Sequence, residues 1–197
     1  NWRLDEAAGG RSRAFADIGS HLMDLVEFVT DDRITRLAAA KRTYWTKRAS
    51  RDAIATEDAV VVTVELAGGA IGTLIVSQVA PGRKNALTLE LGGSAESLVF
   101  EQENPEVLWV GRQAGSLSIP RDPEQLAPDA ARLCAVPAGH PQGYQDAFNA
   151  FVADSYAAMD GDDPEGLPRF TDGRRSVQLV EAVMDAAESD SWLAVAD

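Results

Sequence analysis

The chain of 197 residues has the length and composition of one globular domain, since 45% of its residues are hydrophobic and 25% are charged. Its formal net charge of −13 disfavours binding to a nucleic-acid backbone or to an anionic membrane surface. The single cysteine, Cys134, cannot form an internal disulfide, and no apolar run is long enough for a membrane span or a signal peptide. We therefore expect a cytoplasmic protein with no nucleic-acid or membrane partner.

The start of the chain suggests a piece of a longer protein. It begins Asn1-Trp2-Arg3, without an initiator Met, inside what reads as a structured segment. No glycines form a G-x-G-x-x-G or P-loop pattern between a strand and a helix, so no cradle for nucleotide phosphates is expected here. A nucleotide site, if the whole protein has one, should lie elsewhere.

The first strong pattern is a helix over residues 15–29. Ser12, in the glycine- and arginine-containing loop before it, is a candidate cap. Apolar residues recur at spacings of three and four and form one stripe: Ile18, Leu22, Leu25, Val26 and Val29. An adjacent stripe combines polar and aromatic side chains: Asp17, His21, Asp24 and Phe28.

Residues 34–119 read as successive β-strands. Runs rich in Val, Leu, Ile and Thr are separated by short turn segments, and no helical pattern intervenes, which predicts a mainly antiparallel sheet. In one run alternate residues should share a face: Val60, Val62, Val64 and Leu66.

A proline-rich connection over residues 120–141 leads into helices expected at 142–160 and 172–188, the second capped by Thr171 or Asp172, with a short strand within 192–195. The fold class is α+β: a predominantly antiparallel, open-faced sheet with the three helices on one face. Some apolar strand residues do not fit that face: Val61, Ile75 or Val76, and Val99. A second apolar face is usually buried by a partner, so we expect a homo-oligomer packed sheet to sheet.

The pair Asp17 and His21 is the best candidate for chemistry. Residues four apart on a helix are neighbours, so a carboxylate and an imidazole could reach one small ligand and transfer a proton. Spacing alone favours a simpler interpretation, an Asp stabilised at a helix N-terminus and a His that packs. A metal site is the weakest alternative, because only His140 could add a second imidazole.

Other candidates are polar side chains expected near this helix start or in loops. Arg3, Arg11 and Arg13 could recognise substrate hydroxyls or a carboxylate, and His140 and Tyr144 could line a pocket, although solvation explains each of them as well. A further group should lie on strands, in the core or an interface: Tyr44, Trp45 and Trp109.

Several segments in order resemble the C-terminal substrate domain of the glucose-fructose oxidoreductase/inositol dehydrogenase/rhizopine catabolism (Gfo/Idh/MocA) family. The most specific is D-I-G-S-H at residues 17–21, which is similar to the family's D-x-x-x-H helix. G-Y-Q-D-A-F at 143–148 and V-E-A-V at 180–183 support it by their order. The resemblance covers essentially residues 1–197, as a substrate-binding and oligomerisation domain without the N-terminal Rossmann domain.

The resemblance implies an NAD- or NADP-dependent oxidoreductase that acts on a secondary alcohol of a sugar, inositol or related polyol. It implies proton transfer by His21, with Asp17 as its orienting partner or a substrate contact. The family's E-K-P lysine and nucleotide fingerprint are absent from this sequence, so the fragment alone should be inactive. The alternative is a non-catalytic carbohydrate-binding or oligomerisation module of the same fold.

Overall fold

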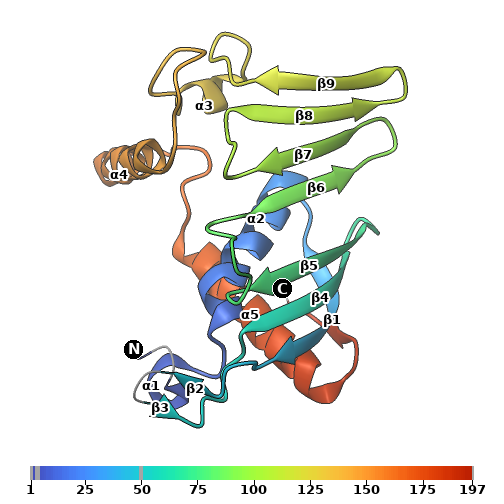
Figure 1. The fold of residues 1–197 in the computed structure, drawn as a ribbon. Coiled ribbons are helices and arrows are strands. Elements are labelled where there is room, and N and C mark those ends of the chain that lie inside the picture. The colour runs from blue at the N-terminus through green and yellow to red at the C-terminus, as the bar shows by residue number, and fades with distance from the viewer. Residues whose placement is uncertain (1, 3–4, 49–50, 197) are drawn as a thin grey trace. The chain divides into compact units, whose positions relative to one another are not determined.

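The computed structural model describes residues 2, 5–48 and 51–196, which belong to two compact units (Figure 1). The first unit comprises Asn1–Gly82 and Arg169–Asp197, and the second comprises Arg83–Pro168. Both contain an antiparallel four-stranded sheet and at least one helix, which confirms the α+β class.

The sheet of the first unit has the strand order β10-β1-β4-β5. Its strands are β1 (Ile34–Arg42), β4 (Ala59–Leu66), β5 (Ile71–Ser77) and β10 (Leu193–Ala194). Separately, β2 (Lys47–Arg48) and β3 (Arg51–Asp52) pair to form a two-stranded ribbon. The helical elements are α1 (Glu6–Gly9), the π-helical turn η2 (Phe15–Gly19), α2 (Ser20–Thr30) and α5 (Phe170–Ser189). In Figure 1, α2 and α5 lie against one face of this sheet, where α5 contacts β1 and α2.

Alternation along β4 places the core between this sheet and its helices. The inward residues expected from the sequence are all at most 6% exposed: Val60, Val62, Val64 and Leu66. From the helical layer, Phe15, Met23, Val183 and Met184 are fully buried. Because the strands repeat every two residues, the intervening side chains face away from this core.

The opposite face of β4 and β5 is open and carries apolar side chains beside Thr63, Thr73 and Glu65. Val61 pairs directly with Ile75, and these side chains are 44% and 72% exposed, while Ile71 at the start of β5 is 80% exposed. Of the two alternatives named from the sequence, Ile75 therefore lies on the open face, whereas Val76 is buried at 3% exposure.

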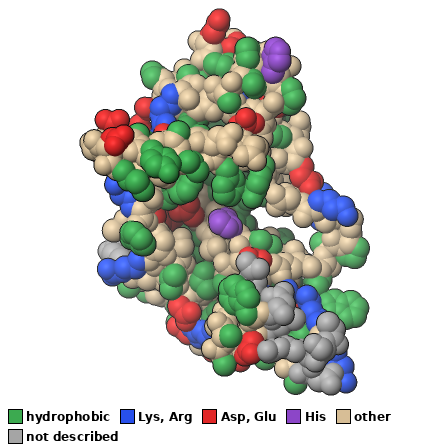
Figure 2. Space-filling view, turned by 90° about the vertical axis from the view of Figure 1, so that its left-hand side faces the viewer, with side chains coloured by type: hydrophobic (Ala, Val, Ile, Leu, Met, Phe, Trp, Pro, Cys, Tyr) green, Lys and Arg blue, Asp and Glu red, His purple; other side chains and the backbone are tan. Residues whose placement is uncertain are grey.

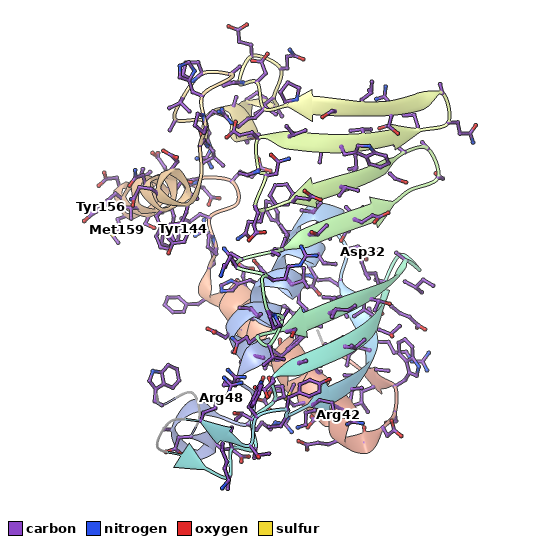
Figure 3. All side chains as sticks on the ribbon, viewed as in Figure 1. Asp32, Arg42, Arg48, Tyr144, Tyr156 and Met159 are labelled. Atoms are coloured by element: carbon purple, nitrogen blue, oxygen red, sulfur yellow. The ribbon has the colours of Figure 1, made fainter. Side chains whose placement is uncertain are left out.

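The second unit contains a four-stranded meander followed by two helices. Its elements are β6 (Thr88–Gly92), β7 (Ser97–Glu101), β8 (Val107–Arg112), β9 (Gly115–Pro120), α3 (Pro128–Ala131) and α4 (Tyr144–Asp160). No residue of α4 is buried, and Tyr144, Tyr156 and Met159 project from it (Figure 3). Figure 2 views the side on which α4 lies in Figure 1 and shows hydrophobic side chains gathered there.

The structure has two four-stranded antiparallel sheets, one in each unit, where the sequence analysis expected one sheet. Residues 78–87, between β5 and β6, form turns and irregular backbone rather than a tight hairpin. The strand β9 lies within the region 34–119 that was expected to be β, apart from its last residue, Pro120. The helix α5 begins at Phe170 with Arg169 as N-cap, not at the expected Thr171 or Asp172, while the short last strand is confirmed as β10. Whether α4 covers the first sheet stays a prediction.

Candidate active site

The candidate pair lies where a π-helical turn passes into an α-helix. In η2 the backbone N–H of Ser20 donates to the carbonyl of Phe15, five residues earlier. A Cβ on Gly19 would lie 2.5 Å from the ring of Phe15, which is fully buried, so this turn needs a glycine at that position. Single π turns inside helices are rare and occur frequently at functional sites. The sequence pattern predicted the helix but not this turn.

Asp17 and His21 lie on either side of that transition. Asp17 is half-buried within η2, and His21 is exposed in the first turn of α2. Gln78, directly after β5, donates from Nε2 to Oδ2 of Asp17 at 2.9 Å. The carboxylate is thus held from the sheet, while the imidazole is accessible to a ligand.

A second acidic group, Asp24, follows His21 by about one turn on α2. Removal from water raises the pKa of its carboxyl, and the neighbouring Asp172 carboxylate adds to that effect, while His21 acts in the opposite direction. His21 therefore has carboxylates one turn before and one turn after it along the helix.

The start of the helix is fixed by Glu57, a carboxylate that the sequence analysis did not single out. Its Oε1 accepts hydrogen bonds from Ser12 Oγ at 2.9 Å, from the N–H of Arg13 at 3.0 Å and from the N–H of Phe15 at 2.9 Å. Free N–H groups at a helix start attract such an anion. Ser12 also accepts from the Ala16 N–H at 3.0 Å, but the N-cap residue is Ala14 rather than the expected Ser12.

The adjacent Asp58 is fully buried and anchors the loop after β1. Its Oδ1 pairs with the guanidinium groups of Arg13 and Arg48, and its Oδ2 accepts from the N–H groups of Tyr44 and Trp45 at 2.7 and 2.8 Å. The hydrogen bonds and ion pairs that these donors make offset the cost of removing the Asp58 carboxylate from water. In the sequence, the indication of this cluster is that two acidic residues, Glu57 and Asp58, directly precede the apolar strand β4.

That loop forms one wall of a pocket of about 450 Å³ in the first unit. It is lined by Trp45, Lys47, Arg48 and residues 78–81. Trp45 and Tyr44 are 58% and 63% exposed, so their assignment to strands was wrong: β1 ends at Arg42, before both residues. The position of the pocket can be found in Figure 3 from the labelled Arg48, which lines it. Gln78 also lines the pocket and hydrogen-bonds Asp17.

The arginines proposed for substrate recognition have intramolecular partners. Arg11 pairs with Glu181 at 2.6 Å and with Asp185 at 2.7 Å, both on α5. The Arg13 side chain is 7% exposed and turns towards Asp58. Substrate contact by either stays a prediction that this geometry does not favour, and Arg3 lies outside the described residues.

The remaining candidates, His140 and Tyr144, belong to the second unit, so their expected place at the same pocket stays a prediction. Both are exposed, and the Tyr144 ring packs against Phe148 with centroids 4.8 Å apart.

Within residues 2, 5–48 and 51–196, no three His, Cys, Asp or Glu side chains are grouped to hold a metal ion. In those same ranges no helix has the length and apolar character needed to cross a membrane.

Comparison with known proteins places this arrangement in context. A family model described as the GFO/IDH/MocA C-terminal domain matches residues 1–99. Levoglucosan dehydrogenase of Pseudarthrobacter phenanthrenivorans is 24% identical over 218 residues, covering 99% of this chain and 54% of that protein.

Solved structures agree with the family match. An oxidoreductase domain protein from Kribbella flavida superposes with a TM-score of 0.88 and 32% identity, covering 100% of this chain and 53% of that chain. An inositol dehydrogenase homolog from Azotobacter vinelandii, complexed with NAD+, gives a TM-score of 0.85 and 26% identity over 98% of this chain and 51% of the other. The chain therefore spans about half the length of these relatives.

Proposed function

Since the chain belongs to the GFO/IDH/MocA family, we propose that it is the substrate-binding half of an NAD(P)-dependent oxidoreductase. The substrate class is a sugar, inositol or related polyol, oxidised or reduced at a secondary alcohol. Relatives named as a levoglucosan dehydrogenase and an inositol dehydrogenase homolog support this class. The cytoplasmic location expected from the sequence remains part of the proposal.

One observation carries the proposal. Gln78 lines the pocket and hydrogen-bonds Asp17, so the pocket adjoins the turn that bears Asp17 and His21. The exposed indole of Trp45 offers a flat apolar surface to the C–H face of a sugar ring, and nearby polar side chains can bind its hydroxyls. This combination suits a polyol better than a purely apolar ligand.

The described residues do not fit the dinucleotide itself, because no strand leads through a G-x-G-x-x-G loop into a helix. We therefore assign NAD(P) binding to the part of the full-length protein outside this chain. When bound, that cofactor would supply hydride transfer to or from the substrate carbon. In the oxidation direction, His21 accepts the proton of the substrate hydroxyl, and Asp17 orients or stabilises the imidazolium. Loss of one hydride and one proton converts the secondary alcohol to a ketone.

The open sheet face supports the expected homo-oligomer. The exposed Val61–Ile75 pair and Ile71 supply apolar side chains that a second copy could cover, with the Thr63–Thr73 pair between them. The alternative of a non-catalytic module predicts the same surface but no turnover.

The test is an activity assay of the full-length protein with NAD+ and NADP+ against levoglucosan, myo-inositol and D-glucose, following absorbance of the reduced cofactor. Turnover with at least one polyol supports the proposal. Binding of a sugar without reduction of either cofactor, across a broader polyol panel as well, would favour the non-catalytic module.

A further inference from the structure

The side chain of Gln78 makes two hydrogen bonds, one as an acceptor and one as a donor. Its Oε1 accepts from Nη1 of Arg13 at 2.5 Å, and its Nε2 donates to Oδ2 of Asp17 at 2.9 Å. A guanidinium can only donate and a carboxylate can only accept. The amide therefore has one orientation that satisfies both neighbours, with its carbonyl towards Arg13 and its NH2 group towards Asp17.

Arg13 is a fixed donor for this contact. Its second terminal nitrogen pairs with Asp58, which is fully buried, and its backbone N–H is held by Glu57. With the side chain only 7% exposed, Arg13 has little freedom to turn to another partner. The orientation of the Gln78 amide is therefore set from the interior of the first unit.

We propose that Gln78 is a positioning residue that fixes the carboxylate of Asp17 through this chain of contacts from Asp58 and Arg13. The inference rests on the proposed function, in which Asp17 orients the proton-transferring His21. Gln78 acts on the reaction through Asp17 and need not touch the reacting atoms. Small displacements of a catalytic group are costly, which makes such an anchor valuable.

Two substitutions in the full-length enzyme separate positioning from simple structural support. Gln78→Glu keeps an oxygen for Arg13 but turns a second oxygen towards the Asp17 carboxylate. Gln78→Met keeps the approximate length and removes both hydrogen bonds. We expect kcat to fall by about 10- to 100-fold in both variants, with KM changed less than about twofold and with Gln78→Glu at least as impaired as Gln78→Met.

A structural role alone predicts the reverse order, since Glu can still accept from Arg13 and should restore activity. The exposed Gln113→Glu, in the turn after β8, is the matched control and should leave kcat and the melting temperature unchanged. Near-normal kcat in Gln78→Glu would overturn the proposal.

A double-mutant cycle with Asp17→Asn tests whether Gln78 acts through Asp17. In that background Gln78→Met should cause little further loss of kcat. A full, independent loss, accompanied by an increase in KM, would mean that Gln78 binds substrate directly from the pocket wall.

Crystal structures of the full-length wild type and Gln78→Met keep the inference separable from the proposed function. The Asp17 carboxylate should occupy one orientation in the wild type and rotate or split in the variant. If no polyol is turned over, the proposed function fails while the crystallographic comparison still decides whether Gln78 positions Asp17. An unchanged Asp17 orientation would overturn the inference whatever the activity.

Discussion

Arg175 of α5 donates from Nη2 to Oε1 of Glu27 on α2 at 2.8 Å, joining two helices that are 148 residues apart at these positions. Both residues are buried, at 9% and 8% exposure. Burial alone would raise the pKa of the Glu27 carboxyl, but hydrogen bonds from Arg175, from the Ile34 N–H and from Arg33 outweigh it and leave the pKa below the usual 4.5. This ion pair stabilises the layer that carries the candidate site.

The first prediction concerns pH and stability. Because the pKa of Glu27 is lowered on folding, its contribution is complete above the unfolded-state pKa and is lost as pH falls through the folded-state pKa. Glu27→Gln leaves Arg175 without its charge partner and should cost about 3 to 5 kcal/mol at pH 7. Urea unfolding from neutral to acidic pH should show this difference shrinking in acid. The exposed Glu124→Gln is the control, and an equal loss in both variants would contradict the assignment.

The second prediction concerns the π turn. Gly19→Ala places a methyl group 2.5 Å from the buried Phe15 ring and should destabilise the protein by about 1 to 3 kcal/mol. Gly173→Ala in α5 meets no atom within 4 Å and should instead stabilise by about 0.5 to 1 kcal/mol. Thermal unfolding of both variants measures the contrast. Similar melting temperatures would show that the Phe15 ring moves aside at little cost.

The third prediction concerns the pocket. Trp45→Ala should raise KM for the polyol several-fold, because the substitution removes the exposed indole and with it the stacking contact to the sugar ring. Trp45→Phe should recover part of the affinity through its smaller aromatic face. Steady-state kinetics of the full-length enzyme decides this, and an unchanged KM in Trp45→Ala would place the substrate elsewhere.

The parts of the fold that followed from sequence are those set by local periodicity. Alternation identified the buried face of β4, and three- and four-residue spacing identified the helices. The separation of the chain into two compact units did not follow, since the irregular segment between β5 and β6 has the turn residues of an ordinary strand connection.

The candidate site was predictable only in part, for a similar reason. Asp17 and His21 stand in one short motif, whereas Glu57 and Asp58 bind partners about 45 residues away on the other side of the core. A charged pair in a sequence reads as solvent-exposed unless its partners are known. Gln78, likewise, acquires its contact with Asp17 only when β5 packs beside η2.

The fourth prediction concerns assembly. Ile75→Lys places a charge in the open face of β5, where the side chain is 72% exposed, and should shift the full-length protein to smaller species in sedimentation velocity. Met159→Lys on α4, at 77% exposure, is the comparison variant in the second unit. A wild-type protein that is monomeric at every concentration would contradict the proposed sheet-to-sheet oligomer.

The last prediction concerns proton transfer by His21. His21→Ala removes the group that accepts the hydroxyl proton, so kcat of the full-length enzyme should fall by about 10² to 10⁴-fold. Affinity for NAD(P)H, measured by fluorescence titration, should change little, because the cofactor is assigned to the part outside this chain. Asp17→Asn should keep the fold and lower turnover, by weakening the orientation or charge stabilisation of the imidazole. His140→Ala is a comparison within the same chain and tests the only other histidine. If His21→Ala folds normally and retains near-normal turnover, the D-I-G-S-H segment has a structural role only.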